Sequence, residues 1–309
     1  MSKERVIEVM DKYAAGVKGK IGLGFKNFKT GDEYYINGND RFPTASVFKV
    51  LLLIELFKQV EQGKFSLSDM YTLKAEDISP GSGLTQYLTP GMSMCLKDYA
   101  MLMMIISDNT CTDIIFRHLG KKNVEATIES LGLKNTRADM DCKELLHSLC
   151  GMPLSASLEE MNKIFKDIES ERNYAMYTDM TIPNDISSPV DMMAIFSKIY
   201  NKEILSPASC QQMMDIMEKC QTNSRIPSLL PRIGPKAIKA MHKTGSLQYI
   251  SNDCGIVITP KHAYGIMMFY NGYTGDPKDR KFDDEDDTLL AELSRDIYVA
   301  LHNDSASVV

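Results

Sequence analysis

A serine and a lysine lie three residues apart at the start of a long apolar stretch. They are Ser46 and Lys49, and the apolar stretch begins at Val50. If a helix begins near Ser46, this spacing places the hydroxyl and the amine on one face of that helix. The free N–H groups and the dipole at the beginning of a helix stabilise developing negative charge. The two residues could therefore form a nucleophilic site.

Two later motifs supply polar groups that could assist such a nucleophile. The sequence Ser-Asp-Asn at 107–109 follows an apolar segment, 96–106, and precedes another segment with helical periodicity. The sequence Lys-Thr-Gly-Ser at 243–246 ends a segment with the pattern of a β-strand. A Ser-x-x-Lys pattern alone is expected about once by chance in a chain of this length. The information therefore lies in the three motifs together and in their order.

The composition is that of a globular protein. The chain has 309 residues, of which 44% are hydrophobic and 25% are charged, enough for one large domain or two closely packed ones. The net charge of −6 argues against nucleic acid or an anionic membrane as the main partner, because both attract basic surfaces. No apolar run reaches the length of a membrane span. We therefore expect a small molecule or a peptide as the partner.

The cysteines and histidines do not suggest a metal site. The seven cysteines have no spacing typical of zinc, and an odd number cannot all form disulfides. The five histidines form no evident ligand cluster, so we expect no metal and no cofactor. Residues 1–8 lack the apolar core of a secretory signal, which indicates a cytoplasmic protein, although a chain trimmed of its leader would look the same.

Apolar periodicity and turn residues predict the order of the elements. The chain begins with a helix and a hairpin, continues with helices, and returns to strands before a last helix. The segment 133–155 is predicted to be an irregular loop. The expected helices are 3–17, 46–62, 96–106, 110–119, 121–131, 157–170, 189–201, 207–219 and 288–301, and the expected strands are 21–25, 33–36, 239–244, 254–259 and 263–270.

The three motifs, in this order, resemble those of class A β-lactamases and penicillin-binding proteins. The resemblance extends from the first helix to the last. It implies an α+β fold of the β-lactamase/transpeptidase type, with a five-stranded antiparallel sheet flanked by the terminal helices and an inserted all-α domain. We accordingly expect 1–44 and 225–309 to form the sheet domain and 45–224 the helical domain. The active site would lie in the cleft between the two.

The resemblance also implies catalytic roles. Ser46 would be the acylated nucleophile, and its backbone N–H would belong to the oxyanion hole. Lys49 would be the neighbouring candidate base, which requires a neutral amine. Lys243 would supply a nearby cation that favours the neutral form. Ser107 would pass a proton to the leaving nitrogen.

The other motif residues would bind the substrate if the resemblance holds. Asn109 would hydrogen-bond the amide of the substrate's side chain. Lys243 and Thr244 would bind its carboxylate. Ser246, directly after Gly245, would give the second N–H of the oxyanion hole.

The sequence departs from the class A pattern in the loop after Ser107. Class A enzymes have a glutamate there that orients the hydrolytic water, and an alignment without gaps puts Cys142 at its position. Leu146 stands where those enzymes have a partner asparagine. Neither side chain can activate water, and Glu144 could replace the glutamate only if the loop shifted in register.

A second departure concerns the binding of the substrate's carboxylate. The strand after Lys243 lacks the arginine that many β-lactamases have there. Arg225 or Arg232 would have to serve in its place.

The sequence therefore predicts a serine hydrolase that forms an acyl-enzyme at Ser46 with β-lactams and hydrolyses it slowly. One alternative is an efficient β-lactamase that uses Glu144 as its base, and another is an esterase or D,D-peptidase. A different class of function is a binding or sensor domain without efficient chemistry. Such a domain would have no need for Lys49 and Ser107 together, which argues against it.

Overall fold

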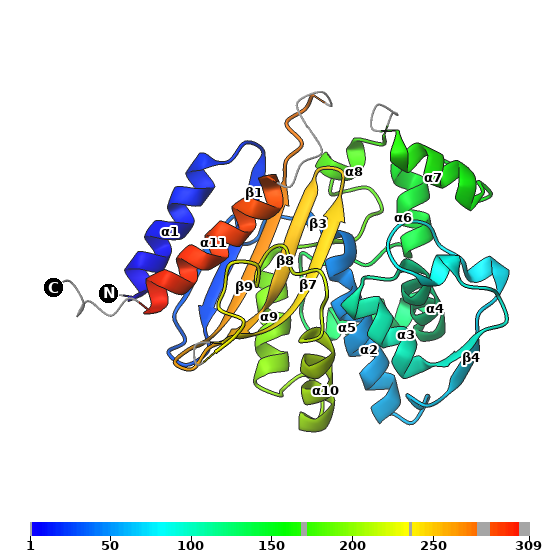
Figure 1. Cartoon of the computed structure of the whole chain (residues 1–309), viewed down its shortest axis with the longest axis horizontal. Helices are drawn as coiled ribbons and strands as arrows, with labels where there is room; N and C mark the ends of the chain where they lie inside the picture. Colours follow the sequence, from blue (N-terminus) through cyan, green and yellow to red (C-terminus); the bar gives the residue numbers. More distant parts are fainter. Residues whose placement is uncertain (1, 168–171, 235–236, 277–284, 303–309) are drawn as a thin grey trace. The chain divides into compact units, whose positions relative to one another are not determined.

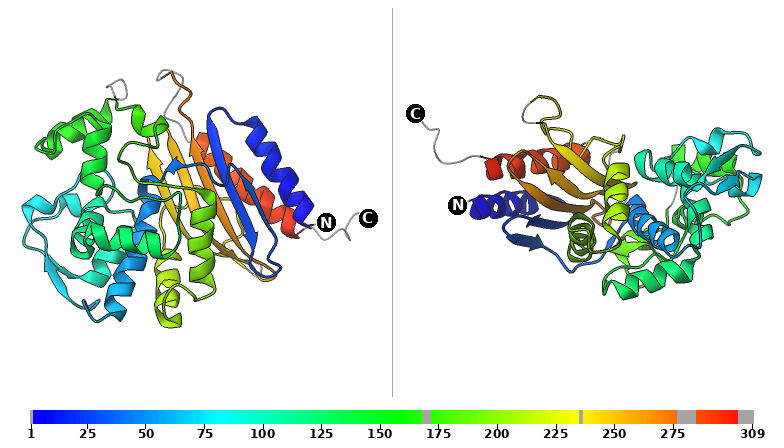
Figure 2. Two further views of the ribbon diagram at one scale, coloured as in Figure 1. Left: turned by 180° about the vertical axis from the view of Figure 1, so that it is seen from behind. Right: turned by 90° about the horizontal axis from the view of Figure 1, so that it is seen from below.

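The computed structural model describes residues 2–167, 172–234, 237–276 and 285–302. Its contacts divide the chain into two compact units. The first combines 1–47 with 187–309, and the second is 48–186. The chain passes from the first unit into the second and then returns, so the second unit is an insertion into the first (Figures 1 and 2).

The first unit is built on a five-stranded antiparallel sheet with the strand order β2-β1-β9-β8-β7 (Figure 1). The strands are β1 (Lys20–Asn27), β2 (Glu33–Ile36), β7 (Lys239–Leu247), β8 (Ile250–Ile258) and β9 (Ala263–Asn271). Segments from both ends of the chain thus pair in one sheet. This confirms the predicted α+β fold and its five-stranded antiparallel sheet.

Helices cover both faces of this sheet. The terminal helices α1 (Ser2–Gly16) and α11 (Glu285–His302) pack against each other on one face (Figures 1 and 2). The helix α9 (Pro189–Tyr200) lies on the other face and contacts β1, β8 and β9. The helix α10 (Pro207–Met217) contacts α9 and β7. The terminal helices therefore flank the sheet as predicted.

The sequence of β1 shows how the two faces differ. Ile21, Leu23 and Phe25 are buried in the apolar core that α1 and α11 complete. Side chains alternate across a strand, so the glycines between them face the other way. A Cβ at Gly22 would lie 2.4 Å from the ring of Phe42 and 3.0 Å from Pro189, the first residue of α9. The large residues thus fill the core, and glycine allows the other layer to approach closely.

The second unit is mostly helical. Its helix α2 (Lys49–Glu61) is buried along most of its length and contacts α3, α4 and α5. The other helices are α3 (Leu96–Ile105), α4 (Asn109–Leu119), α5 (Lys121–Ser130), α6 (Cys142–Leu149), α7 (Leu158–Lys166) and α8 (Ala175–Thr178). The short strands β4 (Met70–Thr72) and β5 (Ser93–Cys95) form an antiparallel pair.

Several short elements complete the chain. Three 3₁₀ helices are present in the described residues: η1 (Ala45–Phe48), η2 (Ala75–Asp77) and η3 (Thr85–Tyr87). Two two-residue strands, β3 (Phe42–Pro43) and β6 (Ile186–Ser187), lie near the two points of the sequence where the units divide.

The division of the chain differs from the expected boundaries. The expected helical part ran over 45–224, whereas the structure divides the chain after Val47 and after Ile186. The reason is that α9 and α10 contact strands of the sheet and therefore belong to the first unit.

Three local expectations also differ from the structure. The segment 133–155, predicted to be a loop, contains α6, whose first turn is stabilised by a capping box. An α-helix was expected to begin near Ser46. The structure instead has the 3₁₀ helix η1 there, and the α-helix α2 begins only at Lys49. The strand expected at 254–259 begins earlier, at Ile250. Of the expected helix 157–170, residues 168–170 lie outside the described residues.

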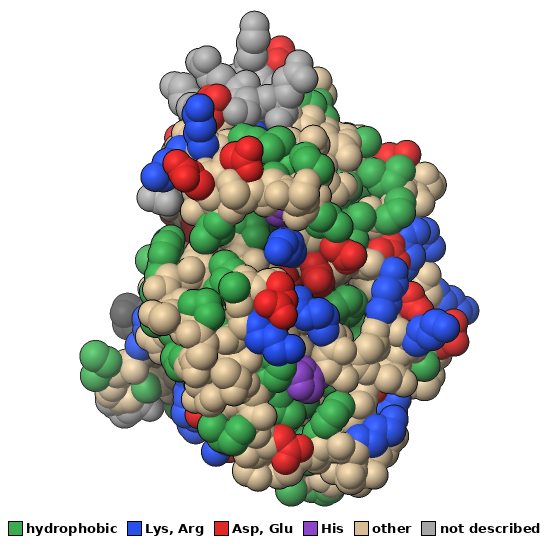
Figure 3. All heavy atoms as spheres, turned by 90° about the vertical axis from the view of Figure 1, so that its right-hand side faces the viewer, with side chains coloured by type: hydrophobic (Ala, Val, Ile, Leu, Met, Phe, Trp, Pro, Cys, Tyr) green, Lys and Arg blue, Asp and Glu red, His purple; other side chains and the backbone are tan. Residues whose placement is uncertain are grey.

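Charged side chains of both signs are interspersed over the face drawn in Figure 3. This distribution accompanies a net charge of −6 for the whole chain. Among the helices that the structure describes, none is both long and apolar enough to cross a membrane.

Candidate active site

Ser46 lies in the single turn of η1, directly before α2, and its side chain is partly exposed. The preceding residue, Ala45, has a φ of +46°, a conformation that is uncommon for residues other than glycine. The N–H of Val47 donates to the carbonyl of Thr44 over 3.1 Å and closes the turn. The turn therefore presents the serine hydroxyl from a defined backbone conformation at the start of a helix.

The sheet of the first unit holds the backbone just before Ser46. The side-chain amide of Asn252, in β8, donates to the carbonyls of Pro43 and Thr44 over 2.8 and 3.1 Å. Its own carbonyl accepts from the N–H of Tyr270 over 3.2 Å, and only 1% of the residue is exposed. Asn252 therefore couples the turn that carries Ser46 to two strands of the sheet. No motif in the sequence marks this residue.

Gly245 lets β7 approach the same turn. A Cβ at this position would lie 2.2 Å from the carbonyl oxygen of Thr44 and 3.1 Å from the backbone nitrogen of Ser46. Real Cβ atoms do not approach a backbone oxygen this closely, so no larger residue fits here without movement. The glycine of the Lys-Thr-Gly-Ser motif thus brings the Ser46 N–H beside strand β7.

The lysine of that motif is buried within β7. Lys243 has no exposed surface, and its Nζ donates to the carbonyl of Thr244 over 2.8 Å. Thr244 is 3% exposed, whereas Ser246 is exposed. The strand therefore places a buried cation two residues before Gly245.

Arg225 adds a second cation beside the same strand. Its Nη2 donates to the hydroxyl of Ser246 over 2.6 Å, and its Nη1 donates to the carbonyls of Gly245 and Asn252 over 3.1 and 2.6 Å. Its Nε forms an ion pair with Asp287 at 2.6 Å. The guanidinium is 3% exposed. Of the two arginines considered from the sequence, Arg225 is thus fixed against the Lys-Thr-Gly-Ser motif.

The second unit brings Lys49 together with the Ser-Asp-Asn motif. The amine of Lys49 is fully buried and lies 2.8 Å from the carbonyl of Ser107, 3.1 Å from the Ser107 hydroxyl and 2.8 Å from the Asn109 side-chain carbonyl. Three acceptors match the three N–H bonds of an ammonium group. Ser107 has a φ of +58°, which turns its carbonyl and its side chain toward the amine.

Asp108 holds the motif in place without facing the amine. It is fully buried and caps α4, with one carboxylate oxygen accepting from the N–H of Cys111 over 2.9 Å. The other oxygen accepts from the N–H groups of Leu84 and Thr85, each over 2.8 Å. Its place in the motif is therefore structural, since it joins the start of α4 to the turn at 83–85.

Cys142, at the position predicted from the gap-free alignment, is the first residue of α6 and is 4% exposed. Burial raises the pKa of its thiol well above the usual range, and the charge of Lys49 acts in the opposite direction. The sulfur is therefore a neutral thiol within electrostatic reach of the amine.

Leu146, at the position of the class A asparagine, lies near Asn109. A Cβ added at Gly81 would lie 3.0 Å from the Leu146 side chain and 2.9 Å from the Asn109 side chain.

The start of α6 is fixed by a buried carboxylate. Asp113 accepts from the N–H groups of Cys142 and Lys143 over 2.7 and 3.0 Å and from the hydroxyl of Ser79 over 2.5 Å. Burial and the charge of Asp141 raise the pKa of Asp113 to about 7, against hydrogen bonds that lower it. Nothing in the sequence distinguished Asp113 from other polar residues of its helix. The hydrogen bonds that Asp113 accepts fix the position of Cys142.

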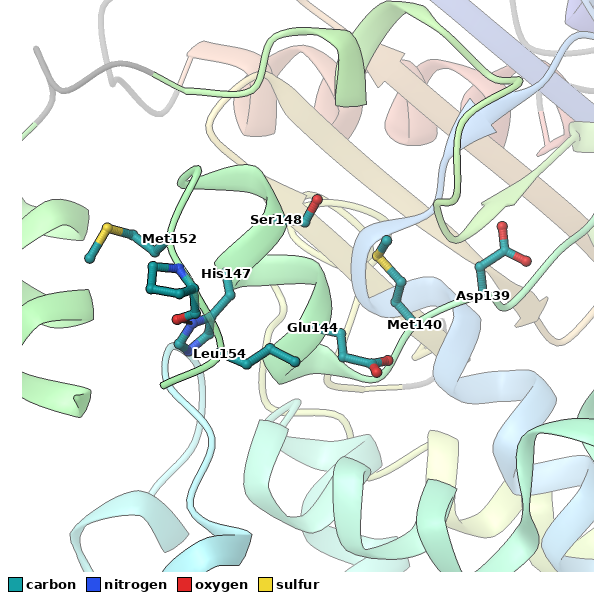
Figure 4. Close-up of a pocket in the computed structure, with 8 residues that line it drawn as sticks. Asp139, Met140, Glu144, His147, Ser148, Met152 and Leu154 are labelled. Carbon is teal, nitrogen blue, oxygen red and sulfur yellow. Dashed lines mark hydrogen bonds between the residues drawn. The ribbon is translucent and has the colours of Figure 1, made fainter. Parts of the chain in front are cut away.

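Glu144 is engaged at the beginning of its own helix. Its carboxylate accepts from the N–H of Asp141 over 3.0 Å, and its N–H donates to the Asp141 carboxylate over 2.8 Å. The residue is exposed and lines a pocket of about 440 Å³ (Figure 4). Figure 4 shows Glu144 and His147 on α6 and Met140 on the segment that leads into it. The carboxylate thus serves the capping box of α6.

The structure therefore assembles the predicted residues in two groups. Lys49, Ser107 and Asn109 are hydrogen-bonded to one another in the second unit, and Gly245 lies against the Ser46 turn in the first. The segment η1 connects the groups along the chain. Among the described residues, no three His, Cys, Asp or Glu side chains are arranged to hold a metal ion.

Comparison with known proteins identifies the family. The model of the Beta-lactamase enzyme family matches residues 3–301, so the chain belongs to this family. Beta-lactamase PSE-4 of Pseudomonas aeruginosa is 31% identical over 124 residues, which are 40% of this chain and 43% of that protein. The chain thus spans less than half of the length of this relative. A beta-lactamase of Proteus vulgaris is 24% identical over 90% of this chain and 81% of its own length.

Solved structures match over nearly the whole chain. A beta-lactamase from Sphaerobacter thermophilus DSM 20745 has a TM-score of 0.77 and 24% identity, covering 97% of each chain. The structure of PBP-A has a TM-score of 0.74 and 26% identity, covering 96% of this chain and 95% of that one. An L158E mutant of PBP-A is described as an acyl-enzyme complex with penicillin-G. The predicted family and the β-lactamase/transpeptidase-like fold are thus confirmed.

The substitution Gly245→Ala tests the close approach of β7 to the Ser46 turn. We expect it to lower the free energy of unfolding by about 1–3 kcal/mol, because the added methyl must displace the Thr44 carbonyl. Chemical denaturation measures the change. Gly16→Ala is the matched control, since a Cβ there meets nothing within 4 Å. Equal stability of the two variants would contradict the close approach.

Proposed function

We propose that the chain is a serine hydrolase that is acylated at Ser46 by β-lactams and releases the acyl group slowly. The observation that carries the proposal is the buried amine of Lys49, hydrogen-bonded to Ser107 and Asn109. A binding domain would gain nothing from a buried amine beside a serine hydroxyl, whereas acyl transfer uses both groups to move a proton. Membership of the Beta-lactamase enzyme family supports the same reaction.

In the proposed acylation, the Ser46 Oγ attacks the lactam carbonyl carbon. Lys49, in its neutral form, accepts the serine proton, and the Ser107 hydroxyl passes a proton to the lactam nitrogen as the C–N bond breaks. The backbone N–H groups of Ser46 and Ser246 stabilise the oxyanion. The close approach of Gly245 to the Ser46 nitrogen supports this pairing, because it sets β7 beside that N–H group.

The cations of the first unit are proposed to bind the substrate's carboxylate. Lys243 and Thr244 would bind it directly. Arg225 would add positive charge beside the same strand, since its Nη2 reaches the Ser246 hydroxyl. An arginine beside this motif supports recognition of an anionic substrate despite the missing arginine in β8.

Release of the acyl group is proposed to be slow because, in the described part of the chain, neither Cys142 nor Glu144 offers a free carboxylate to activate water. The thiol of Cys142 is neutral and buried, and a thiol that keeps its proton is a poor general base. The carboxylate of Glu144 caps α6, and the backbone hydrogen bond that it accepts supports a structural role. These observations favour slow hydrolysis over an efficient β-lactamase that uses Glu144.

Ser46→Ala tests the nucleophile. Incubation of the full chain with penicillin G should give a single covalent adduct in the intact mass, and the variant should give none, because only Ser46 would form the ester. Ser68→Ala, an exposed serine outside the motifs, should label like the unmodified chain. Equal labelling of Ser46→Ala would remove Ser46 as the nucleophile.

Cys142→Glu tests the missing base. We expect the acyl adduct to decay about 10²-fold faster or more, since a positioned general base contributes about 10²–10⁴-fold. Burial and the neighbouring acids would raise the pKa of the introduced carboxyl, against the charge of Lys49. Decay is followed by intact mass after removal of free penicillin G.

Two matched variants control this experiment. Cys142→Ser removes the thiol without adding a base and should leave the decay slow. Glu144→Gln should also leave it unchanged. Loss of release in Glu144→Gln would contradict the proposal and favour the alternative β-lactamase mechanism.

A further inference from the structure

The side chain of Asn252 is a buried junction between the sheet and the turn that carries Ser46. Its amide nitrogen donates to the carbonyls of Pro43 and Thr44 over 2.8 and 3.1 Å. Its side-chain carbonyl accepts from the N–H of Tyr270 over 3.2 Å. A side-chain amide has two N–H donors and one carbonyl, so these three contacts use both of its polar atoms. An aspartate of the same shape could not donate to either backbone carbonyl.

The backbone of Asn252 is fixed by its neighbours in the sheet. It pairs with Gly245 across β7 and β8, and its carbonyl accepts from Nη1 of Arg225 over 2.6 Å. Only 1% of the residue is exposed, so little water competes for its hydrogen bonds. The amide therefore holds the turn from a rigid position.

The carbonyl of Thr44 is the point at which the sheet and the turn meet. It accepts from the Asn252 amide and also from the N–H of Val47, the bond that closes the turn. These two bonds orient the peptide group that leads into Ala45. The φ of +46° at Ala45 is sterically unfavourable for alanine, and such a conformation persists only where the surrounding structure holds it. The residue directly after this strained alanine is Ser46.

We propose that Asn252 is a positioning residue for the nucleophile. Through the Thr44 carbonyl it holds Ala45 in its left-handed conformation, and this conformation sets the direction of the Ser46 hydroxyl and N–H. The inference rests on the proposed function, since it gives Asn252 a part in acylation at Ser46. Because Asn252 acts through the turn alone, its effect should fall on the rate of acylation and not on the affinity for the substrate.

Asn252→Ala tests this assignment through the rate of acylation. Penicillin G is mixed with the full chain at several concentrations, and intact mass follows the adduct over time. We expect the maximal rate to fall about 10²-fold, because a small displacement of a reacting group has an effect of this size. The concentration that gives half of the maximal rate should stay the same, since Lys243 and Arg225 are unchanged. An equal rate in the variant and the unmodified chain would overturn the proposal.

Asn27→Ala is the matched control. Asn27 is 5% exposed and belongs to the same sheet, and its side chain accepts from two backbone N–H groups, those of Lys29 and Thr30. Its loss should destabilise the hairpin of β1 and β2 and leave the acylation rate unchanged. If Asn27→Ala slowed acylation as much as Asn252→Ala, the effect would be one of general stability, and the proposal would be overturned.

Ala45→Gly separates positioning of the turn from a merely structural role. Glycine adopts a positive φ without strain, so it lowers the cost of the conformation that Asn252 holds. Combined with Asn252→Ala, it should therefore recover about tenfold of the lost rate. The same glycine should not rescue Ser107→Ala, which removes a group proposed for proton transfer. Absence of recovery in the first combination would overturn the proposal.

Hydrogen exchange tests the hold on the turn without a substrate. Deuterium uptake of the segment 44–48, measured by mass spectrometry, should be faster in Asn252→Ala than in the unmodified chain and unchanged in Asn27→Ala. Equal uptake in all three proteins would overturn the proposal. If the unmodified chain forms no penicillin adduct, the proposed acylation fails, and hydrogen exchange still decides the role of Asn252.

Asn252→Ser covers the case in which Asn252→Ala does not fold. The hydroxyl keeps one donor in the space of the amide, so we expect a smaller loss of rate and a smaller rise in deuterium uptake, both in the same direction. A folded Asn252→Ser variant that changes neither quantity would overturn the proposal.

Discussion

The buried amine of Lys49 is the interaction on which the helical part of the candidate site depends. An amine removed from water needs protein acceptors in place of its hydration. Ser107 provides two of them, through its carbonyl and its hydroxyl, and Asn109 provides the third. The left-handed backbone of Ser107 turns its carbonyl and hydroxyl toward the amine, and the cap formed by Asp108 holds the motif at the start of α4. One motif therefore satisfies a buried amine and supplies the groups proposed for proton transfer.

The surroundings of two buried cysteines shift the pKa of their thiols in opposite directions. Cys142 stands among the acids at the start of α6, where burial and the neighbouring carboxylates raise the pKa of its thiol. For Cys220, burial raises the pKa of the thiol, but the interaction with His242 and the charge of Lys243 lower it overall. The first thiol is thus unsuited to act as a base at the position where class A enzymes have a glutamate.

The sequence predicted the parts of the structure that local patterns determine. Apolar periodicity located the terminal helices and the strands at both ends of the chain, and the three motifs identified Lys49, Ser107 and Gly245. Contacts between distant segments were not predictable in this way. The link from Asn252 to the Ser46 turn joins residues about two hundred positions apart, and Asn252 appears in the sequence only as a polar residue in a strand. The assignment of α9 and α10 to the sheet likewise depends on packing.

The helix α6 was missed for a different reason, because its signal is present in the local sequence. Its start carries the sequence signal of a capping box, with Asp141 three residues before Glu144. Reading that signal would have predicted both the helix and the engagement of the Glu144 carboxylate. In contrast, the placement of Cys142 at the position of the class A glutamate followed from the resemblance to the family and stays a prediction.

Rapid mixing with a chromogenic cephalosporin tests the central claim, fast acylation followed by slow release, most directly. The account predicts a burst of about one equivalent of product per chain, followed by a much slower phase limited by hydrolysis of the acyl-enzyme. Rapid, linear turnover without a burst would contradict slow release. Absence of any burst or adduct would contradict acylation itself.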